Sequence, residues 1–245
     1  MITFLKRVHT YFYRFNVGFF YVLFWPLMYF FSRKESRYFY MNKMRGLWGY
    51  LSSLCSGIVY HFEMEKQIDW SRTYIICPNH TSNLDITAVS VLAKNNYSFM
   101  GKDELLDGFV TGLFFRTVDL PVNRESKIAS FRAFKNAEER LRKGVTMIIF
   151  PEGRIPETYP PELGEFKRGP FKLAIELKIP IIPISSADTW KVLWDDGIKH
   201  GSTPGVCHIF VHEPIETAHL TTDDADRLRD EVHAIIEKKL AQHDN

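Results

Sequence analysis

An imidazole and a carboxylate stand five positions apart in residues 79–85, NHTSNLD, directly after the apolar run 74–78. A neutral imidazole, with a pKa of about 6.5, can accept a proton from a hydroxyl at physiological pH. A carboxylate bonded to its other nitrogen fixes the tautomer and stabilises the imidazolium that forms. His80 and Asp85 therefore predict a general base and its orienting group, acting on a hydroxyl that the substrate itself carries.

A purely structural interpretation of the same segment stands beside the catalytic one. Ser82 followed by Asp85 matches the capping box that opens a helix, in which the serine and the acidic residue each bond to backbone N–H groups. On this interpretation Asp85 is only a cap. The remainder of the chain favours the catalytic interpretation.

Three further segments follow in a definite order: VNR at residues 122–124, FPEGR at 150–154 and IPIIPI at 179–184. In this order and spacing, they and NHTSNLD resemble the four ordered blocks of the glycerophospholipid acyltransferase superfamily. The likeness is greatest to bacterial 1-acyl-sn-glycerol-3-phosphate acyltransferases, which are lysophosphatidic acid acyltransferases. It covers about residues 70 to 215.

The resemblance implies transfer of a fatty acyl group from an acyl thioester to the sn-2 hydroxyl of 1-acyl-glycerol 3-phosphate, which forms phosphatidic acid. His80 would be the general base, oriented by Asp85, and the attack would be direct, without an acyl-enzyme. Acyl-CoA or acyl-ACP (acyl carrier protein) would serve as co-substrate, with no other cofactor. The expected partners are a lyso-phospholipid acceptor and membrane lipids, with no nucleic acid.

Cationic side chains are needed to hold the acceptor's phosphate, and a guanidinium can grip phosphate oxygens with paired donors. The resemblance assigns this role to Arg124, of the second block, and to Lys102. Lys167 or Arg168, after the third block, would assist. A solvated surface position is the alternative for each of Arg124 and Lys102.

Glu152 and Gly153 match the third block, which the family uses to bind the acceptor. Asn79 and nearby backbone N–H groups would hold either the loop or the developing oxyanion. Arg154 follows Gly153 directly, where the common pattern places Thr or Ser between them. This departure motivates a rival acceptor, another lyso-lipid such as a lyso-amino-acid lipid. A non-catalytic membrane-binding protein on the same scaffold is the alternative from another class.

The first 62 residues carry eight Lys and Arg and one acid, together with 20 of the 36 aromatic residues. Their uncharged run 15–31 is at the short end of the roughly 17 to 25 residues that cross a bilayer, and Pro26 should kink it. Because basic residues lie on both sides of this run, the positive-inside bias favours a hairpin in one leaflet over a single span. The predicted location is the membrane, at the cytoplasmic face of the inner membrane if the protein is bacterial. An aromatic helix pair packed on the domain is the structural alternative.

Neither a disulfide framework nor a zinc site is indicated, since Cys55, Cys77 and Cys207 are odd in number and widely spaced. The nine histidines form no metal-binding spacing. His208 and His212 alternate with apolar residues as they would on a strand. We therefore expect no metal.

Beyond residue 62, short β-branched runs alternate with helical segments, which predicts an α/β fold with a largely parallel or mixed sheet flanked by helices. The predicted domains are a membrane-associating helical hairpin over 1–62 and an α/β acyltransferase domain over 63–245. Helices are expected over 126–143, between Ser126 and Gly144, and over 222–242. Strands are expected near 73–78, 97–100, 118–122, 145–150, 180–185 and 206–211. The motifs would then meet at the carboxyl ends of strands, where ligand sites of open α/β sheets gather.

Overall fold

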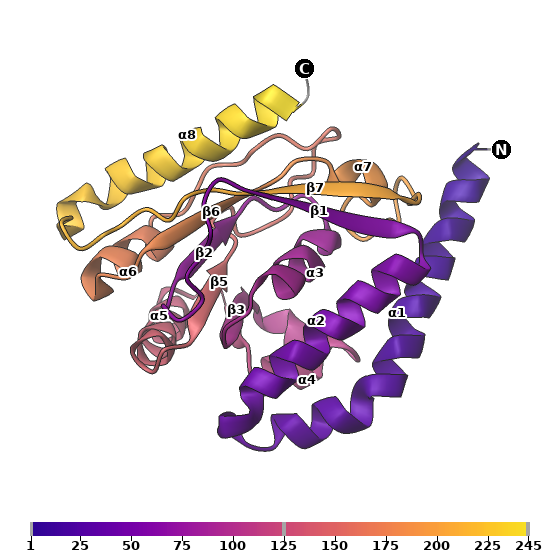
Figure 1. Ribbon diagram of the computed structural model, residues 1–245, viewed down its shortest axis with the longest axis horizontal. Coiled ribbons are helices and arrows are strands. Elements are labelled where there is room, and N and C mark those ends of the chain that lie inside the picture. The colour runs from indigo at the N-terminus through magenta and orange to yellow at the C-terminus, as the bar shows by residue number, and fades with distance from the viewer. Residues whose placement is uncertain (1, 124–125, 244–245) are drawn as a thin grey trace.

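A computed structural model describes residues 2–123 and 126–243, which form a seven-stranded mixed sheet in the order β1-β7-β6-β2-β5-β3-β4 (Figure 1). Among these described strands, neighbours run parallel except β6 and β7, which are antiparallel. The predicted α/β class and mixed sheet are confirmed. The strands are β1 (Ile58–Met64), β2 (Ile75–Pro78), β3 (Tyr97–Lys102), β4 (Leu120–Val122), β5 (Thr146–Ile149), β6 (Ile181–Ser186) and β7 (Gly205–Val211).

Helices cover both faces of this sheet, because alternate residues of its central strands point to opposite sides. Ile75 and Cys77 of β2 pack into a core that includes side chains of α5, α6 and α8, whereas Ile76 packs with α3. Burying each such aliphatic side chain contributes about 1.5–3 kcal/mol. The helices of this domain are α3 (Asn83–Leu92), α4 (Thr111–Phe115), α5 (Lys127–Arg142), α6 (Gly169–Leu177), α7 (Thr189–Val192) and α8 (Ala225–His243), with 3-10 turns η2 (Asp103–Leu106) and η3 (Thr222–Asp224).

The predicted helix over 126–143 is confirmed with its termini. The Ser126 hydroxyl accepts the Ala129 N–H at 3.2 Å, and Gly144 follows the helix with φ of +83°. The predicted terminal helix begins at Ala225 rather than at residue 222, because η3 comes first. Thr221 and Asp224 form a capping box at that turn.

Strand β1 was not predicted, because its first five residues, 58–62, contain no charged side chain and were assigned to the N-terminal helical hairpin. Gly57, with φ of +71°, turns the chain sharply between the helix that ends at Cys55 and this strand. β1 then pairs in parallel with β7, which lies almost 150 residues later in the chain. The predicted domain boundary at residue 62 therefore falls inside a strand of the sheet.

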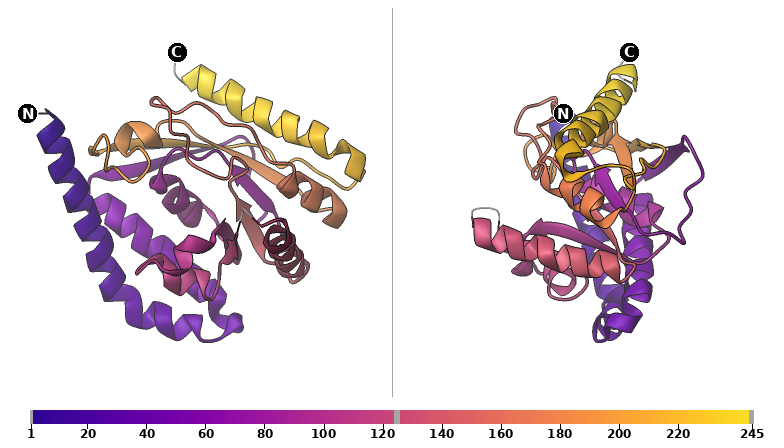
Figure 2. Two further views of the ribbon diagram at one scale, coloured as in Figure 1. Left: turned by 180° about the vertical axis from the view of Figure 1, so that it is seen from behind. Right: turned by 90° about the vertical axis from the view of Figure 1, so that its left-hand side faces the viewer.

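The N-terminal helices α1 (Ile2–Ser32) and α2 (Tyr38–Cys55) are joined through η1 (Glu35–Arg37) and lie side by side at one side of the molecule, away from α8 (Figure 2). α1 continues through Pro26 and bends along its course (Figure 1). Among the described residues, one helical stretch, Thr3–Ser32, is long and apolar enough to cross a membrane. Its exposed side chains include Phe4, Tyr11, Phe15, Phe19, Trp25 and Phe30.

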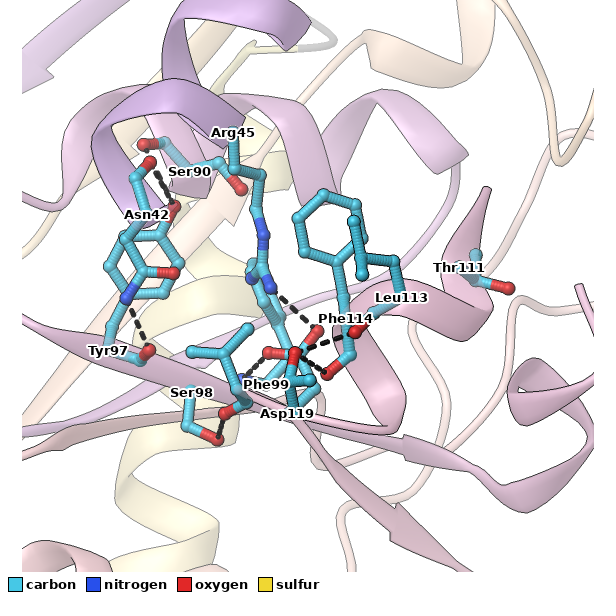
Figure 3. A network of polar contacts seen from close by, with 12 residues as sticks. Asn42, Arg45, Ser90, Tyr97, Ser98, Phe99, Thr111, Leu113, Phe114 and Asp119 are labelled. Carbon is cyan, nitrogen blue, oxygen red and sulfur yellow. Dashed lines mark hydrogen bonds and ion pairs between the residues drawn. The ribbon is translucent and has the colours of Figure 1, made fainter. Parts of the chain in front are cut away.

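A buried ion pair fastens α2 to the sheet (Figure 3). Arg45 Nη2 lies 2.9 Å from Asp119 Oδ2, with 6% and 4% of the two side chains exposed. The Arg45 guanidinium lies 4.3 Å from the ring centre of Phe114, and Asp119 Oδ1 accepts the N–H of Phe99 in β3 at 3.0 Å. One side of the helix pair is therefore specifically docked, while the opposite side exposes its aromatic residues.

Candidate active site

His80 and Asp85 meet at the carboxyl end of β2, where α3 begins. His80 Nδ1 lies 3.1 Å from Asp85 Oδ2, and the same oxygen accepts the backbone N–H groups of Thr81 at 2.7 Å and Ser82 at 2.8 Å. Asp85 is fully buried, whereas 14% of the His80 side chain is exposed. The capping and catalytic interpretations of Asp85 are thus compatible, since one carboxylate makes both sets of contacts.

The second Asp85 oxygen is also occupied. Thr189, the first residue of α7, donates its hydroxyl to Asp85 Oδ1 at 2.7 Å, and its oxygen lies 3.1 Å from the hydroxyl of Thr81. With both oxygens bonded, the carboxylate cannot rotate away from the imidazole without losing these contacts. Sequence reasoning missed Thr189, whose one available signal was its place just after the predicted strand 180–185.

An aromatic ring fixes the imidazole plane. Phe150 stacks on His80, with ring centres 4.0 Å apart and an angle of 25° between the ring planes. The ring of Phe99 stacks in turn with that of Phe150, with centres 6.4 Å apart. Phe150 directly precedes the Pro-Glu-Gly segment in the sequence. Its position at the end of an apolar run predicted only a strand residue, not a contact with His80. Its ring therefore covers one face of the imidazole.

Asn79 joins the ends of two strands. Its Nδ2 donates to Ser186 O at 3.1 Å, and its Oδ1 accepts the Ser186 N–H at 2.7 Å. The side chain is buried at the point where β2 ends beside β6. These contacts fit one of the two roles predicted for Asn79, which is to hold the loop.

Glu152 also lies beside His80, at the end of β5. Its Oε1 accepts the His80 N–H at 2.7 Å and its Oε2 accepts the Gly164 N–H at 2.8 Å. Burial raises the pKa of Glu152 to about 7, with a smaller contribution from the Asp85 charge, although the two N–H donors oppose the shift. The Glu152 carboxyl group therefore connects the loop that carries His80, called the base loop below, to the long loop that follows Gly153.

Gly153 has φ of +78°, and a Cβ placed there would lie 2.8 Å from Lys167 Nζ. The structure thus brings together the third-block glycine and one of the predicted phosphate-binding cations. Arg154, the residue that departs from the family pattern, is exposed. Close approach of the Lys167 ammonium to the chain here depends on the missing side chain of Gly153.

Lys102, exposed at the end of β3, lines a cavity of about 500 Å³. The other lining residues are Asp103, Glu104, Leu106, Asp107, Val122 and Asn123. Arg124, the first candidate for the phosphate, lies outside the described residues. The cavity therefore adjoins the strand that leads to Arg124.

Asp195 is a site residue that the sequence did not indicate. Its N–H donates to Thr81 O at 3.2 Å and its O accepts the Asn83 N–H at 3.0 Å, with φ of +53°. Burial, and then the nearby Asp196, raise the pKa of the Asp195 carboxyl, and the charges of His80, Lys199 and Lys102 act in the opposite direction. The charges of Lys102 and Lys199 therefore act on this carboxyl, which lies on the His80 side of the site.

Comparisons with known proteins identify the family of the chain. The sequence profile described as Acyltransferase matches residues 57–187. An uncharacterized acyltransferase of Schizosaccharomyces pombe is 28% identical over 80% of this chain and 70% of its own length. The 1-acyl-sn-glycerol-3-phosphate acyltransferase of Haemophilus influenzae is 27% identical over 74% and 72%, and the mouse alpha form is 28% identical over 68% and 58%.

A solved structure shares the fold. The crystal structure of the 1-acyl-sn-glycerophosphate (LPA) acyltransferase PlsC from Thermotoga maritima matches with a TM-score of 0.79 and 22% identity. The match covers 97% of this chain and 95% of that one, so it includes the N-terminal helices. The family expected from the motifs is confirmed, and the chain belongs to the acyltransferase family.

Proposed function

We propose that this protein transfers a fatty acyl group from an acyl thioester to the sn-2 hydroxyl of 1-acyl-glycerol 3-phosphate, forming phosphatidic acid. The observation that carries the proposal is the His80–Asp85 pair at the carboxyl edge of the sheet. The names of the Haemophilus and mouse relatives support the choice of acceptor.

In the proposed mechanism the pair acts on the acceptor hydroxyl. With His80 Nδ1–H donated to Asp85, Nε2 is the ring nitrogen that can accept the hydroxyl proton. The acceptor oxygen attacks the thioester carbonyl as its proton passes to Nε2. The tetrahedral intermediate then collapses, the carbon–sulfur bond breaks, and the departing thiolate takes the proton from the imidazolium.

Transfer is direct in this scheme, with no acyl-enzyme. Burial raises the pKa of the Cys77 and Cys207 thiols, which disfavours the thiolate needed for nucleophilic attack. The buried Ser82 hydroxyl accepts the Leu84 N–H as a helix cap. The acyl donor is acyl-CoA or acyl carrier protein, and no further cofactor enters the reaction.

We assign the phosphate of the acceptor to Lys102, Lys167 and Arg124. Lys102 lines the cavity near the end of β3, and Lys167 Nζ lies against Gly153. Glu152 acts in the acceptor region by holding the base loop and the loop after Gly153. Lys102 and Lys167 supply the positive charge that an anionic head group requires, while Asp103, Glu104 and Asp107 line the same cavity as Lys102.

The lipid substrate and product require a membrane surface. The exposed aromatic side of the α1–α2 pair, with basic residues at its flanks, supports a hairpin that enters one leaflet at the cytoplasmic face. The docked side, with the Arg45–Asp119 pair, would hold the α/β domain against that leaflet.

A second acceptor class is favoured by one feature. Exposed Arg154 follows Gly153 directly and changes the charge of the third block. A lyso-lipid with a different head group, such as a lyso-amino-acid lipid, would undergo the same chemistry at His80.

The test is product analysis by mass spectrometry with the purified full chain in liposomes. A thioester donor is supplied with a competing mixture of lysophosphatidate, glycerol 3-phosphate and a lyso-aminolipid. We expect phosphatidate from the wild type and its loss in His80→Ala, while His61→Ala, an exposed histidine of β1, keeps full activity. Acylation of the aminolipid alone would establish the second acceptor class, and equal phosphatidate in wild type and His80→Ala would rule out the mechanism.

A further inference from the structure

Two histidines and an aspartate meet outside the site described above. His208 lies on β7, His243 is the last residue of α8, and Asp188 follows β6. The possible ligand atoms of the three all lie within 4.8 Å of one another. Asp188 Oδ2 is 2.6 Å from His208 Nδ1 and 3.2 Å from His243 Nε2.

We propose that Asp188, His208 and His243 bind a divalent transition-metal ion, with Zn²⁺ as the best fit. Two imidazole nitrogens and one carboxylate oxygen are a donor set that Zn²⁺ accepts, with a water molecule in the fourth position. This proposal departs from the expectation of no metal. The three residues lie at distant places in the chain, so their spacing carried no signal.

The geometry is close to what a tetrahedral ion requires. Zinc–ligand distances of about 2.0–2.2 Å place ligand atoms roughly 3–3.5 Å apart. The separation of Asp188 Oδ2 and His243 Nε2 already falls in this range, and His208 would move away by about half an ångström as the ion replaces a proton.

The exposure and the hydrogen bonds of these three side chains also suit a bound ion. Asp188 is 11% exposed, His208 36% and His243 23%, so the carboxylate is shielded while the imidazoles leave a route from solvent. The other Asp188 oxygen, Oδ1, accepts the His208 N–H at 2.7 Å, which fixes the direction of the carboxylate. Such a supporting bond is typical of metal-binding carboxylates.

None of the three ligands belongs to the His80–Asp85 pair, so we assign the ion a role in holding the fold and none in acyl transfer. It would tie the end of α8 to the segment that contains Thr189, which donates its hydroxyl to Asp85. Metal binding would therefore stabilise the segment that contains Thr189, which contacts Asp85 of the catalytic pair.

The experiment is isothermal titration of the full chain with Zn²⁺ in detergent micelles, after removal of any purification tag. We expect one ion per chain and affinity losses of about tenfold or more in His208→Ala and His243→Ala. His219→Ala, an exposed histidine before α8, should bind as the wild type does. Co²⁺ in the wild type should give the visible absorption of a four-coordinate site.

Folding of each variant is checked by circular dichroism without metal. If His208→Ala is misfolded, Asp188→Asn replaces it, because the amide keeps the shape and removes the charge; it should lose affinity likewise. Failure of the wild type to bind Zn²⁺, or equal binding in wild type, Asp188→Asn and His243→Ala, would overturn the proposal and leave a hydrogen-bonded cluster only.

Discussion

Asp85 places one carboxylate oxygen, Oδ2, 3.1 Å from His80 Nδ1 and uses the same oxygen to accept the first N–H groups of the turn into α3. The helix terminus therefore fixes the carboxylate, and the carboxylate fixes the imidazole. A cap formed by a buried charge is rigid because any movement of Asp85 leaves backbone donors unpaired.

Replacing Asp85 with Asn should impair catalysis more than folding. The amide keeps an oxygen for the cap but cannot stabilise an imidazolium, so we expect kcat to fall by roughly 10²–10⁴. Steady-state assays in liposomes measure the change. Because the pair acts as a unit, His80→Ala with Asp85→Asn should be no slower than His80→Ala alone; independent, multiplying losses would contradict that coupling.

Thr189 is a positioning residue, and its hydroxyl is the part that matters. Thr189→Val leaves Asp85 Oδ1 without its donor at 2.7 Å, which should cost about 1–3 kcal/mol in stability and lower kcat by about tenfold. Thr189→Ser restores the donor and should restore kcat. KM for the acceptor should stay the same in both variants. Equal kcat in the Val and Ser variants would show that Asp85 does not depend on this bond.

Local signals explain why the catalytic loop could be predicted. An apolar run, a serine cap and a carboxylate three residues later fall within residues 74–85, so β2, the start of α3 and the pair are specified by neighbours in sequence. The helix α5 has the same property, with Ser126 at one end and Gly144 at the other.

The rest of the site depends on contacts that sequence spacing does not encode. Asn79 bonds to Ser186, 107 residues away, because β6 pairs with β2, and Thr189 reaches Asp85 through the same pairing. Asp195 meets the loop through its main chain, which carries no residue-type signal. β1 was missed for a related reason, since its partner β7 lies far along the chain.

Glu152 should make stability depend on pH. Its pKa is raised from 4.5 to about 7, so between these values the folded protein holds a proton that the unfolded chain has lost. The contribution of Glu152 to the unfolding free energy is therefore largest at low pH and falls as pH rises through this window, by on the order of 3 kcal/mol.

Glu152→Gln removes this titration. Gln also presents an NH₂ group to one of two backbone donors, but that cost is the same at every pH. The melting temperature of wild type minus that of Glu152→Gln should thus decrease between about pH 5 and about pH 8. A difference that stays constant over this range would mean that Glu152 titrates normally.

The ion pair between Arg45 and Asp119 should determine how α2 docks. Arg45→Met leaves a buried carboxylate unpaired, which should destabilise the protein by about 3–5 kcal/mol. Adding Asp119→Asn keeps an acceptor for the Phe99 N–H, removes the stranded charge and should recover much of the loss.

Thermal unfolding and limited proteolysis of the segment before Gly57 measure this effect. Arg142→Met is the matched control, because Arg142 pairs with Glu138 at the surface and should contribute no more than about 1 kcal/mol. If Arg45→Met were no more destabilising than Arg142→Met, the buried pair would not hold the helix.

Gly153→Ala separates backbone strain from substrate binding. Ala at φ of +78° should lower the free energy of unfolding by about 1–2 kcal/mol. Its Cβ would stand 2.8 Å from the present position of Lys167 Nζ, so the ammonium would have to move. Gly144 has φ of +83°, but a Cβ there meets Thr73 Oγ1 only at an ordinary 3.8 Å. Gly144→Ala therefore carries similar strain without touching the site.

We expect both glycine variants to melt at similarly reduced temperatures and only Gly153→Ala to raise KM for lysophosphatidate. KM for the thioester donor should change less, because Lys167 is assigned to the phosphate of the acceptor. An increase in acceptor KM of the same size in Gly144→Ala would attribute the effect to general destabilisation. An unchanged KM in Gly153→Ala would remove Lys167 from the phosphate site, because the displaced ammonium would then have no part in holding the acceptor.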